Sequence, residues 1–309
     1  MIVVENLTKK YGSLTAVRGL SFRVEKGKVW GLLGPNAAGK TTTMRVLTGY
    51  LSATDGRASV GPYDVFEQPN EVKKIIGYLP ETVPLYPDMT VTGYLRFITD
   101  IKQVPSSKKK GAVDRAVATA GLESVRGRLI KNISRGFKQR VGIAQALIHD
   151  PQVLILDEPT IGLDPAQIIE IRQLIKSLKK NHTIILSTHI LQEVTQTCDG
   201  AVIINEGQLM ASGSLEELTS SFKDKDGVIL KLRRGSAEAA ALLKKIPGVE
   251  AVKREANEYR IEWTKGRRDL RDDIARLVVD KDLGLLEMRP AALNIEDLYL
   301  KIVSGGSVQ

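Results

Sequence analysis

The sequence contains a single cysteine, Cys198, among 309 residues. One thiol excludes an intramolecular disulfide, and this usage fits a reducing compartment. No apolar run approaches the roughly 20 residues that a membrane-spanning helix needs. The N-terminal segment, Met1–Glu5, lacks the basic start and apolar core of a signal peptide. From these absences we expect a cytosolic protein that cannot itself form a path across a membrane.

The charges of the chain are unbalanced, with 45 Lys and Arg against 36 Asp and Glu and a net charge of +9. Such an excess favours an anionic membrane surface, nucleic acid or an acidic partner. The basic residues are scattered, however, and lack the interleaved aromatic platform of a nucleic-acid site. We therefore interpret the charge as a solvated lysine-rich surface and predict no specific nucleic-acid binding.

Strand-like and helix-like segments alternate along the first two-thirds of the chain. A helical pattern covers residues 40–47, and another runs from about 88 to 150, interrupted by a loop at 105–111. The alternation predicts an α/β fold with a mostly parallel sheet and a helical subdomain. Apolar runs typical of strands buried on both faces lie at 29–33, 153–156, 184–187 and 201–204, and a shorter strand-like run lies at 2–4.

A charged turn at 222–227 marks a boundary, so we predict one domain over 1–222 and a second over 223–309. The second has the order β-α-β-β-α-β, which predicts a small α+β domain of the ferredoxin-like, split βαβ type. A last helix is expected over 295–303. The other predicted elements are strands at 228–232, 249–254, 259–263 and 284–288 and helices at 236–245 and 267–280.

The strongest chemical signal is Gly34–Thr41, which matches G-x-x-x-x-G-K-[ST] between a predicted strand and a predicted helix. Backbone N–H groups of such a loop cradle phosphate oxygens, and the helix N-terminus adds its dipole. Lys40 would place a charge near the β- and γ-phosphates, and Thr41 would offer a hydroxyl to Mg²⁺. A chance glycine turn fits this context poorly. The predicted contacts are Gly34, Pro35, Asn36, Ala37, Ala38, Gly39, Lys40, Thr41 and Thr42.

Two acids, Asp157 and Glu158, follow the apolar run at 153–156. Adjacent carboxylates at a buried strand end are costly unless a cation or proton lies there. We expect Asp157 to hold Mg²⁺, directly or through water, and Glu158 to act as general base on an attacking water. A surface turn after a core strand is the alternative, and the phosphate loop disfavours it.

Three further motifs make the chain resemble the ATP-binding subunits of ABC transporters. They are the signature Ile133–Arg140, the turn Gly162–Pro165 and the triplet Ser187–His189. The resemblance covers residues 1–220. It implies the P-loop NTPase fold of an ABC ATPase domain, ATP and Mg²⁺ as ligands, and a head-to-tail dimer that sandwiches two ATP molecules.

The resemblance also implies roles for residues outside the loop. Ser134, Arg135 and Gly136 open a helix whose N-terminus would bind the γ-phosphate of ATP held by the other subunit. Asp164 would line the dimer seam. His189 would contact the γ-phosphate; without the triplet it would be read as a satisfied histidine at a strand end.

Tyr11 would stack on adenine, an interaction worth about 1–3 kcal/mol by analogy with nucleic-acid sites, although alone it would be read as a core or surface residue. His149 and His182 lack a motif, and we interpret them as structural. Cys198 is expected to be a small buried residue.

The sequence departs from the family pattern at three places. Glu81 stands where Gln is usual, and a carboxylate there can still ligate Mg²⁺. Arg135 and Phe137 replace common Gly and Gln, as in a subset of exporters. Ala37 replaces a common glycine, which costs on the order of 1 kcal/mol if that position needs a positive φ.

The C-terminal domain makes the chain similar to exporters of the drug, sodium and gliding-motility kind. We expect an ATP-hydrolysing subunit at the cytoplasmic face of the membrane that contacts a separate permease through residues 81–95. It would dimerise with itself or with a related subunit. A soluble ABC ATPase acting on the ribosome or nucleic acid is the alternative, disfavoured by the single phosphate loop and the lack of a long coiled coil. A non-hydrolysing module is disfavoured by Glu158 and His189.

Overall fold

The computed structural model describes residues 1–221, 225–264, 269–291 and 299. These residues form two compact units that divide after Leu215. The sequence pattern placed the domain boundary after residue 222, and helix α8 (Leu215–Ser221) lies between the two positions. In the described part of the chain, no helix combines the length and apolarity that crossing a membrane requires.

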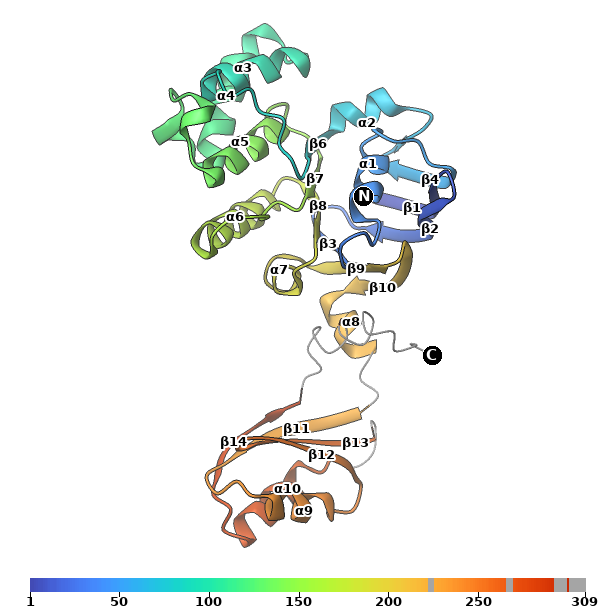
Figure 1. The fold of residues 1–309 in the computed structure, drawn as a ribbon, viewed down its shortest axis with the longest axis vertical. Helices are drawn as coiled ribbons and strands as arrows, with labels where there is room; N and C mark the ends of the chain where they lie inside the picture. The colour runs from blue at the N-terminus through green and yellow to red at the C-terminus, as the bar shows by residue number, and fades with distance from the viewer. Residues whose placement is uncertain (222–224, 265–268, 292–298, 300–309) are drawn as a thin grey trace. The chain divides into compact units, whose positions relative to one another are not determined.

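The N-terminal unit is built around a six-stranded sheet (Figure 1). Its strands are, from edge to edge, β10 (Gln208–Ser214), β9 (Gly200–Asn205), β3 (Val29–Leu33), β8 (Thr183–Thr188), β7 (Val153–Asp157) and β6 (Ile76–Leu79). All neighbours pair in parallel except β10 with β9. Every residue of β3, β7 and β8 is buried, Trp30 among them. The predicted, mostly parallel sheet is thereby confirmed.

A second sheet of four antiparallel strands lies beside the first. Its order is β2 (Leu14–Val24), β1 (Ile2–Tyr11), β4 (Asp55–Val60) and β5 (Tyr63–Asp64). Helix α1 (Lys40–Leu47) packs between the two sheets, with Met44 and Leu47 fully buried. One apolar core therefore joins both sheets to the helix that follows the glycine loop. The other helices along the central sheet are α2 (Pro69–Ile75), α6 (Pro165–Leu178) and α7 (Leu191–Thr197).

The predicted helical subdomain is present as a group of helices with its own apolar core. It contains α3 (Val91–Ile101), α4 (Ser106–Ala120), α5 (Arg135–Leu147) and two 3₁₀ turns, Glu123–Val125 and Ile130–Asn132. The predicted loop at 105–111 is wrong after its first residue, because α4 begins at Ser106. Pro105 precedes the helix, and a buried stripe at helical spacing holds its later turns against the core: Ala112, Val113, Ala116, Val117 and Ala120.

After α8, the described residues of the C-terminal unit form a four-stranded antiparallel sheet and the helices α9 and α10. Along the chain these are β11 (Lys225–Leu232), α9 (Ala237–Lys244), β12 (Val249–Glu255), β13 (Glu258–Thr264), α10 (Arg271–Asp280) and β14 (Leu285–Pro290). The strand order β12-β13-β11-β14 puts β13 between β11 and β12. The predicted helix at 295–303 lies outside the described residues except for Tyr299.

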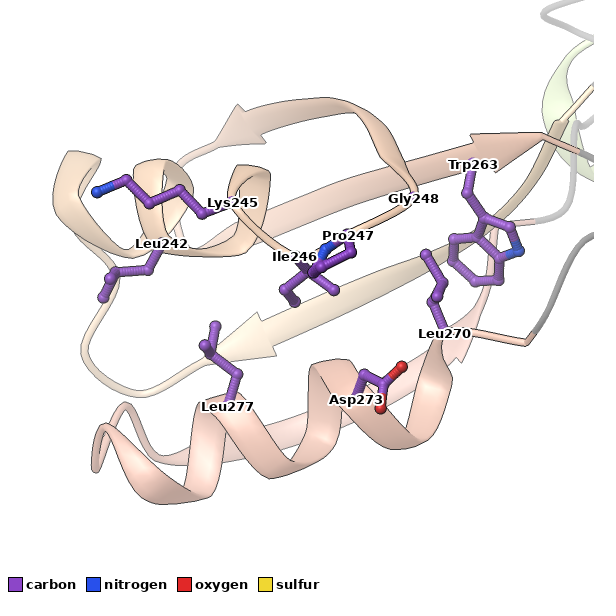
Figure 2. A pocket seen from close by; sticks show the side chains of 9 residues that line it. All are labelled: Leu242, Lys245, Ile246, Pro247, Gly248, Trp263, Leu270, Asp273 and Leu277. Atoms are coloured by element: carbon purple, nitrogen blue, oxygen red, sulfur yellow. The ribbon is translucent and has the colours of Figure 1, made fainter.

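An open hollow of about 810 Å³ lies between α9 and α10 (Figure 2). Leu242 of α9 and Leu277 of α10 line it from opposite sides, and the ring of Trp263 lies at one end. Lys245 and Asp273 add one charge of each sign to the lining. The hollow is therefore mainly apolar.

Candidate functional site

The loop that joins β3 to α1 is held tightly against neighbouring backbone. A Cβ on Gly34 would lie 2.3 Å from the carbonyl oxygen of Ile204, and one on Gly39 would lie 2.6 Å from that of Ala16. Gly39 also has a φ of 99°, and Ala37 has a φ of 64°. Glycine is therefore needed at two of these positions, whereas Ala37 bears the strain of a left-handed residue with a Cβ.

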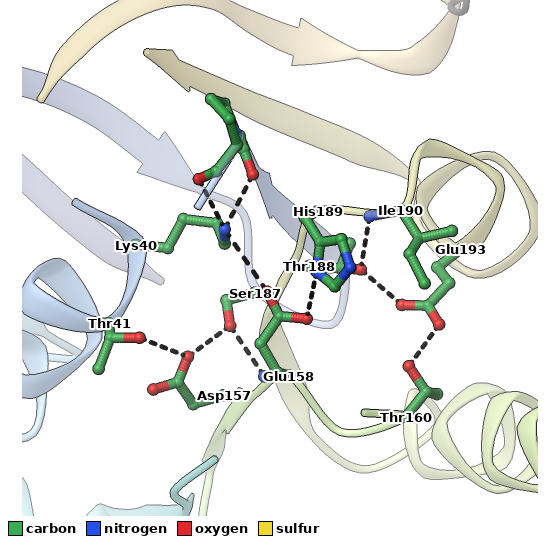
Figure 3. Close-up of polar contacts among 12 residues, drawn as sticks. Lys40, Thr41, Asp157, Glu158, Thr160, Ser187, Thr188, His189, Ile190 and Glu193 are labelled. Carbon is green, nitrogen blue, oxygen red and sulfur yellow. Dashed lines mark hydrogen bonds and ion pairs between the residues drawn. The ribbon is translucent and has the colours of Figure 1, made fainter. Parts of the chain in front are cut away.

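Lys40, the first residue of α1, directs its ammonium group to the centre of this loop. Its Nζ donates to the carbonyl oxygens of Gly34 at 2.8 Å and Pro35 at 3.0 Å. The same nitrogen lies 3.5 Å from Oε1 of Glu158, and Lys40 is 6% exposed (Figure 3). A buried cation thus stands between the loop and the end of β7.

Asp157 ends β7 opposite Ser187 of the adjacent parallel strand β8. Its Oδ1 accepts hydrogen bonds from Oγ of Ser187 at 2.5 Å and Oγ1 of Thr41 at 3.3 Å. Its Oδ2 is buried and has no hydrogen-bond partner in the described part of the chain. A buried carboxylate oxygen left free beside a threonine hydroxyl fits a hard, oxygen-seeking cation such as Mg²⁺.

Glu158 connects the loop to the end of β8. Its Oε2 lies 3.0 Å from Nδ1 of His189, and its backbone N–H donates to Oγ of Ser187 at 2.9 Å. The residue is 6% exposed and has a φ of 46°, a strained backbone conformation for a side chain of this size. Because β7, β8 and β3 are adjacent parallel strands, the segments after their carboxyl ends bring the acid, the imidazole and Lys40 together.

A hollow of about 470 Å³ opens at these groups and collects most of the predicted site residues. Ten of them line it: Tyr11, Asn36, Ala37, Gly39, Lys40, Thr41, Thr42, Glu81, Glu158 and His189. Leu14, Ala16 and Ile161 complete the lining and were not predicted. Tyr11 is 44% exposed, with Nζ of Lys9 lying 5.4 Å from its ring centroid. The ring is thus accessible to a flat partner.

The signature residues and Asp164 lie outside this hollow, at the starts of α5 and α6. Ser134 caps α5 by accepting a hydrogen bond from the backbone N–H of Phe137 at 3.3 Å, and Gly136 lies in the first turn. Asp164 caps α6, and Arg135 donates to the carbonyl oxygen of Ile161 at 3.1 Å. Their predicted contacts require a second chain.

The two histidines without a motif contact backbone carbonyl groups near the sheet. Nε2 of His149 lies 2.9 Å from the carbonyl oxygen of Ile76, and Nδ1 of His182 lies 2.6 Å from that of Pro151. Both histidines therefore bond to the backbone, as predicted.

Burial raises the pKa of Tyr78 to about 12, with a further contribution from Asp157, so the phenol beside β7 stays neutral.

Sequence reasoning missed the contributions of Ser187, Thr160, Thr188 and Glu193 to this site. Ser187 and Thr188 belong to a motif that was recognised for its histidine alone. Glu193 is 2% exposed in α7, and its neighbours Gln192 and Thr195 are also polar. A helix of this composition gives no signal that one acid points inward.

A constrained glycine loop with a central lysine, facing carboxylates at the end of a parallel strand, defines a nucleotide-binding protein of the P-loop class. The family described as ABC transporter matches residues 17–161. Bacitracin transport ATP-binding protein BcrA of Bacillus licheniformis is 33% identical over 310 residues, covering 100% of this chain and 99% of the relative. The chain therefore belongs to the ABC transporter family, as one of its ATP-binding subunits.

Two further similarities agree with this assignment. The uncharacterised ABC transporter ATP-binding protein YxlF of Bacillus subtilis is 33% identical, covering 98% of this chain and 99% of the relative. A solved structure described as the ATP-binding subunit of an ABC transporter matches with a TM-score of 0.65 and 29% identity, covering 72% of this chain and 93% of that one. The family and the ABC ATPase fold predicted from the motifs are thus confirmed.

Proposed function

We propose that this chain hydrolyses ATP and drives an export-type ABC transporter, as a peripheral subunit bound to a separate permease at the cytoplasmic face of the membrane. One observation carries the proposal of hydrolysis. The carboxylate of Glu158 lies between the ammonium of Lys40 and the imidazole of His189, at the mouth of the phosphate loop. A buried acid at that place is suited to take a proton from water.

The phosphates of ATP would bind in the loop, where Lys40 replaces its carbonyl contacts with phosphate oxygens. Thr41, Asp157 and Glu81 would hold Mg²⁺, which supplies positive charge against the phosphates and completes its ligands with phosphate and water. The free Oδ2 of Asp157 supports this arrangement. No cluster of three His, Cys, Asp or Glu that could hold a metal occurs in the described ranges, and a phosphate-assisted Mg²⁺ site needs none.

In the proposed reaction Glu158 accepts the proton of the attacking water, and His189 keeps the carboxylate and the γ-phosphate in register. The hydrogen bond from the Glu158 backbone to Ser187 fixes the strained turn that presents the carboxylate. Ser187 donates to Asp157 at the same time, so the two acids are oriented as a pair. Lys40 stabilises negative charge on the phosphates.

A second copy, or a related subunit, would complete the site. Its Ser134, Arg135 and Gly136 would approach the γ-phosphate at the N-terminus of α5, where unpaired backbone N–H groups favour an anion. Asp164 would lie at the seam. This head-to-tail closure is the proposed power stroke, and hydrolysis would reopen it.

The proposed permease contact lies in residues 81–95, where Tyr86 is 54% exposed. The relative BcrA is named for bacitracin transport, which supports an exporter of antibiotic-like compounds for this chain. The alternative of a soluble ribosome- or nucleic-acid-acting ATPase is not favoured, because relatives that match the full length are transporter subunits.

The test compares Glu158→Gln and Lys40→Ala with the exposed control Glu67→Gln. Glu158→Gln should bind Mg-ATP and accumulate as a dimer while hydrolysis stops, because the amide keeps the shape but cannot accept a proton. Lys40→Ala should lose ATP binding. Labelled-ATP titration, size determination and phosphate release measure the three outcomes. Turnover of Glu158→Gln at the rate of the control would remove Glu158 from the proposed role.

A further inference from the structure

A buried polar network connects the two segments that leave the site from β7 and β8 (Figure 3). Thr160 follows Glu158 by two residues, and Thr188 directly precedes His189. Glu193 of α7 contacts both threonines: Oγ1 of Thr160 donates to its Oε1, and Oγ1 of Thr188 donates to its Oε2 at 2.6 Å. The side chain that joins them is 2% exposed, and the threonines are 4% and 0% exposed.

The donors and acceptors of this network are matched. The Thr188 hydroxyl donates to Glu193 and accepts from the backbone N–H of Ile190 at 3.0 Å, so both of its functions are used. Each carboxylate oxygen of Glu193 accepts one hydroxyl. A guanidinium nitrogen of Arg172, in α6, lies 4.0 Å from Oε1 and offsets the buried negative charge. Nε of Arg172 has no hydrogen-bond partner in the described part of the chain, whereas both oxygens of the Glu193 carboxylate are bonded. A buried carboxylate bonded on both sides rigidifies the segments that it joins.

We propose that Glu193 is a positioning residue for ATP hydrolysis, acting by fixing the segment after Glu158 relative to the segment that carries His189. The inference rests on the proposed function, because it concerns the general base and its histidine. Glu158 has a strained backbone, and such a conformation persists only where its surroundings hold it. The bonds from Thr160 and Thr188 to one carboxylate add to the hold of the Glu158–Ser187 bond and keep Oε2 of Glu158 at 3.0 Å from His189.

The side-chain bonds of the network do not involve the groups proposed to bind phosphate, although the backbone N–H of Gly34 donates to the carbonyl oxygen of Thr188 at 3.4 Å, a bond that side-chain substitutions leave in place. Lys40, Thr41 and the glycine loop belong to β3 and α1, whereas the network joins β7, β8 and α7. Breaking it should therefore lower kcat much more than it weakens ATP binding. The misalignment of a catalytic pair costs roughly 10- to 100-fold in rate.

A conservative substitution of Glu193 should preserve its links to both threonines. In Glu193→Gln the amide oxygen can accept from Thr188, and the amide nitrogen can donate to the oxygen of Thr160, so both links remain. Glu193→Leu removes both links at similar size. Thr160→Val and Thr188→Val each remove one link to the carboxylate while keeping Glu193, and Thr188→Val also removes the acceptor of the Ile190 backbone N–H. Thr195→Val is the matched control, because its hydroxyl is exposed and, among the described residues, bonds to the Gln192 carbonyl oxygen of the same helix.

The experiment measures kcat, the Kd of Mg-ATP and the thermal unfolding of these full-length variants. We expect kcat to fall roughly 10- to 100-fold in Glu193→Leu and in the same direction in both valine variants. The kcat of Glu193→Gln and of Thr195→Val should stay within about threefold of the wild-type value. The Kd of Mg-ATP should change by no more than about threefold in any of the variants. A Glu193→Leu variant as active as Thr195→Val, or a Kd that rises in step with the loss of kcat, would overturn the proposal. If Glu193→Leu does not fold, the two valine variants decide in the same way.

A second readout separates this inference from the proposed hydrolysis. The chain has three histidines, so the His189 ring signal is assignable by NMR with a His189→Gln variant. It should shift in Glu193→Leu and Thr188→Val and stay in place in Glu193→Gln and Thr195→Val, whether or not ATP is hydrolysed. An inactive wild type would contradict the proposed function alone. An unmoved His189 signal in Glu193→Leu would contradict the positioning role alone.

Discussion

At the scale of single residues, Ala37 carries the clearest local cost in the phosphate loop. Its φ of 64° lies in the left-handed region, where a Cβ costs roughly 1–2 kcal/mol. Replacement by glycine removes that strain but raises the entropy of the unfolded chain, a loss of about 0.4–1 kcal/mol. The strain is the larger effect, so Ala37→Gly should raise the free energy of unfolding by about 0.5–1 kcal/mol in a urea titration.

The neighbouring Ala38 provides the control, since it lies in the same loop, is 2% exposed and is not among the residues with positive φ. Ala38→Gly has no strain to relieve and loses a buried methyl group. It should lower the free energy of unfolding by about 1 kcal/mol. Equal effects of the two substitutions would show that the backbone angle of Ala37 is not the cause.

His149 gives the fold a pH dependence. Burial, helped by the nearby Lys102, lowers the pKa of His149 to about 4 from an unfolded value of 6.5. The neutral ring is favoured in the fold, so its stabilising contribution is complete above pH 6.5 and is lost as the pH falls from 6.5 towards 4. Between pH 7 and pH 5, wild type should lose on the order of 1 kcal/mol more stability than His149→Gln. Parallel pH profiles of the two proteins would contradict this.

At the scale of elements, the strands that carry the catalytic groups were predictable, whereas several others were not. Strands β3, β7 and β8 are buried on both faces, so they are continuous apolar runs in the sequence. The start of α4 has the composition of a loop and is largely exposed, and it continues a helix whose later turns are buried in the helical core. In β2, exposed and buried residues do not alternate regularly, so the sequence lacks the two-residue period of a strand and did not predict this element.

For the site, too, the sequence predicts what local patterns determine and not what tertiary packing determines. The residues of local motifs were predicted, because each motif combines fixed spacing with a distinctive residue type. Ser187 and Glu193 act through bonds that only the pairing of β7 with β8 and the docking of α7 create. Tertiary contacts of this kind leave no trace in one sequence.

The contact between α5 and β6 depends on one glycine. A Cβ on Gly77 would lie 2.1 Å from the carbonyl oxygen of Ala146, a backbone atom of α5. Gly77→Ala must therefore separate helix and strand, and should lower the free energy of unfolding by about 1–3 kcal/mol, as other forms of overpacking do. Chemical denaturation of the full chain measures this.

The matched control is Gly111→Ala in α4, where the nearest atom to a new Cβ would be a terminal nitrogen of Arg115 at 3.5 Å. In that helix interior alanine should stabilise by about 0.5–1 kcal/mol. If both alanines stabilised the chain, the close approach of α5 to β6 would not be what Gly77 provides.

At the scale of the whole molecule, the two units separate the nucleotide chemistry from the C-terminal sheet. Every residue proposed to bind ATP, Mg²⁺ or the attacking water lies before residue 190. A chain ending at Ser221 should fold and bind ATP with the affinity of the full chain, since the compact N-terminal unit is retained to Leu215. Any loss of dimer contacts should appear as a turnover that depends more steeply on protein concentration and recovers at high concentration.

The measurement compares ATPase rate against concentration for both chains. A truncated protein that folds, binds ATP and dimerises normally but fails to hydrolyse would assign the C-terminal unit a direct part in catalysis. That result would require a revised division of the chain.

The indole ring of Trp263, at the end of the hollow between α9 and α10, can report on the C-terminal unit by its fluorescence. The chain has two tryptophans, and each compact unit contains one: Trp30 in β3 and Trp263 in β13. Both are buried, at 8% and 4% exposed, so each indole should emit at a blue-shifted wavelength until its own unit unfolds or its surroundings change. Trp30→Phe leaves a fluorophore that reports on the C-terminal unit and its hollow, and Trp263→Phe leaves one in the strand that leads into the phosphate loop. The full-length protein therefore contains a separate fluorescent reporter for each unit, with no label attached.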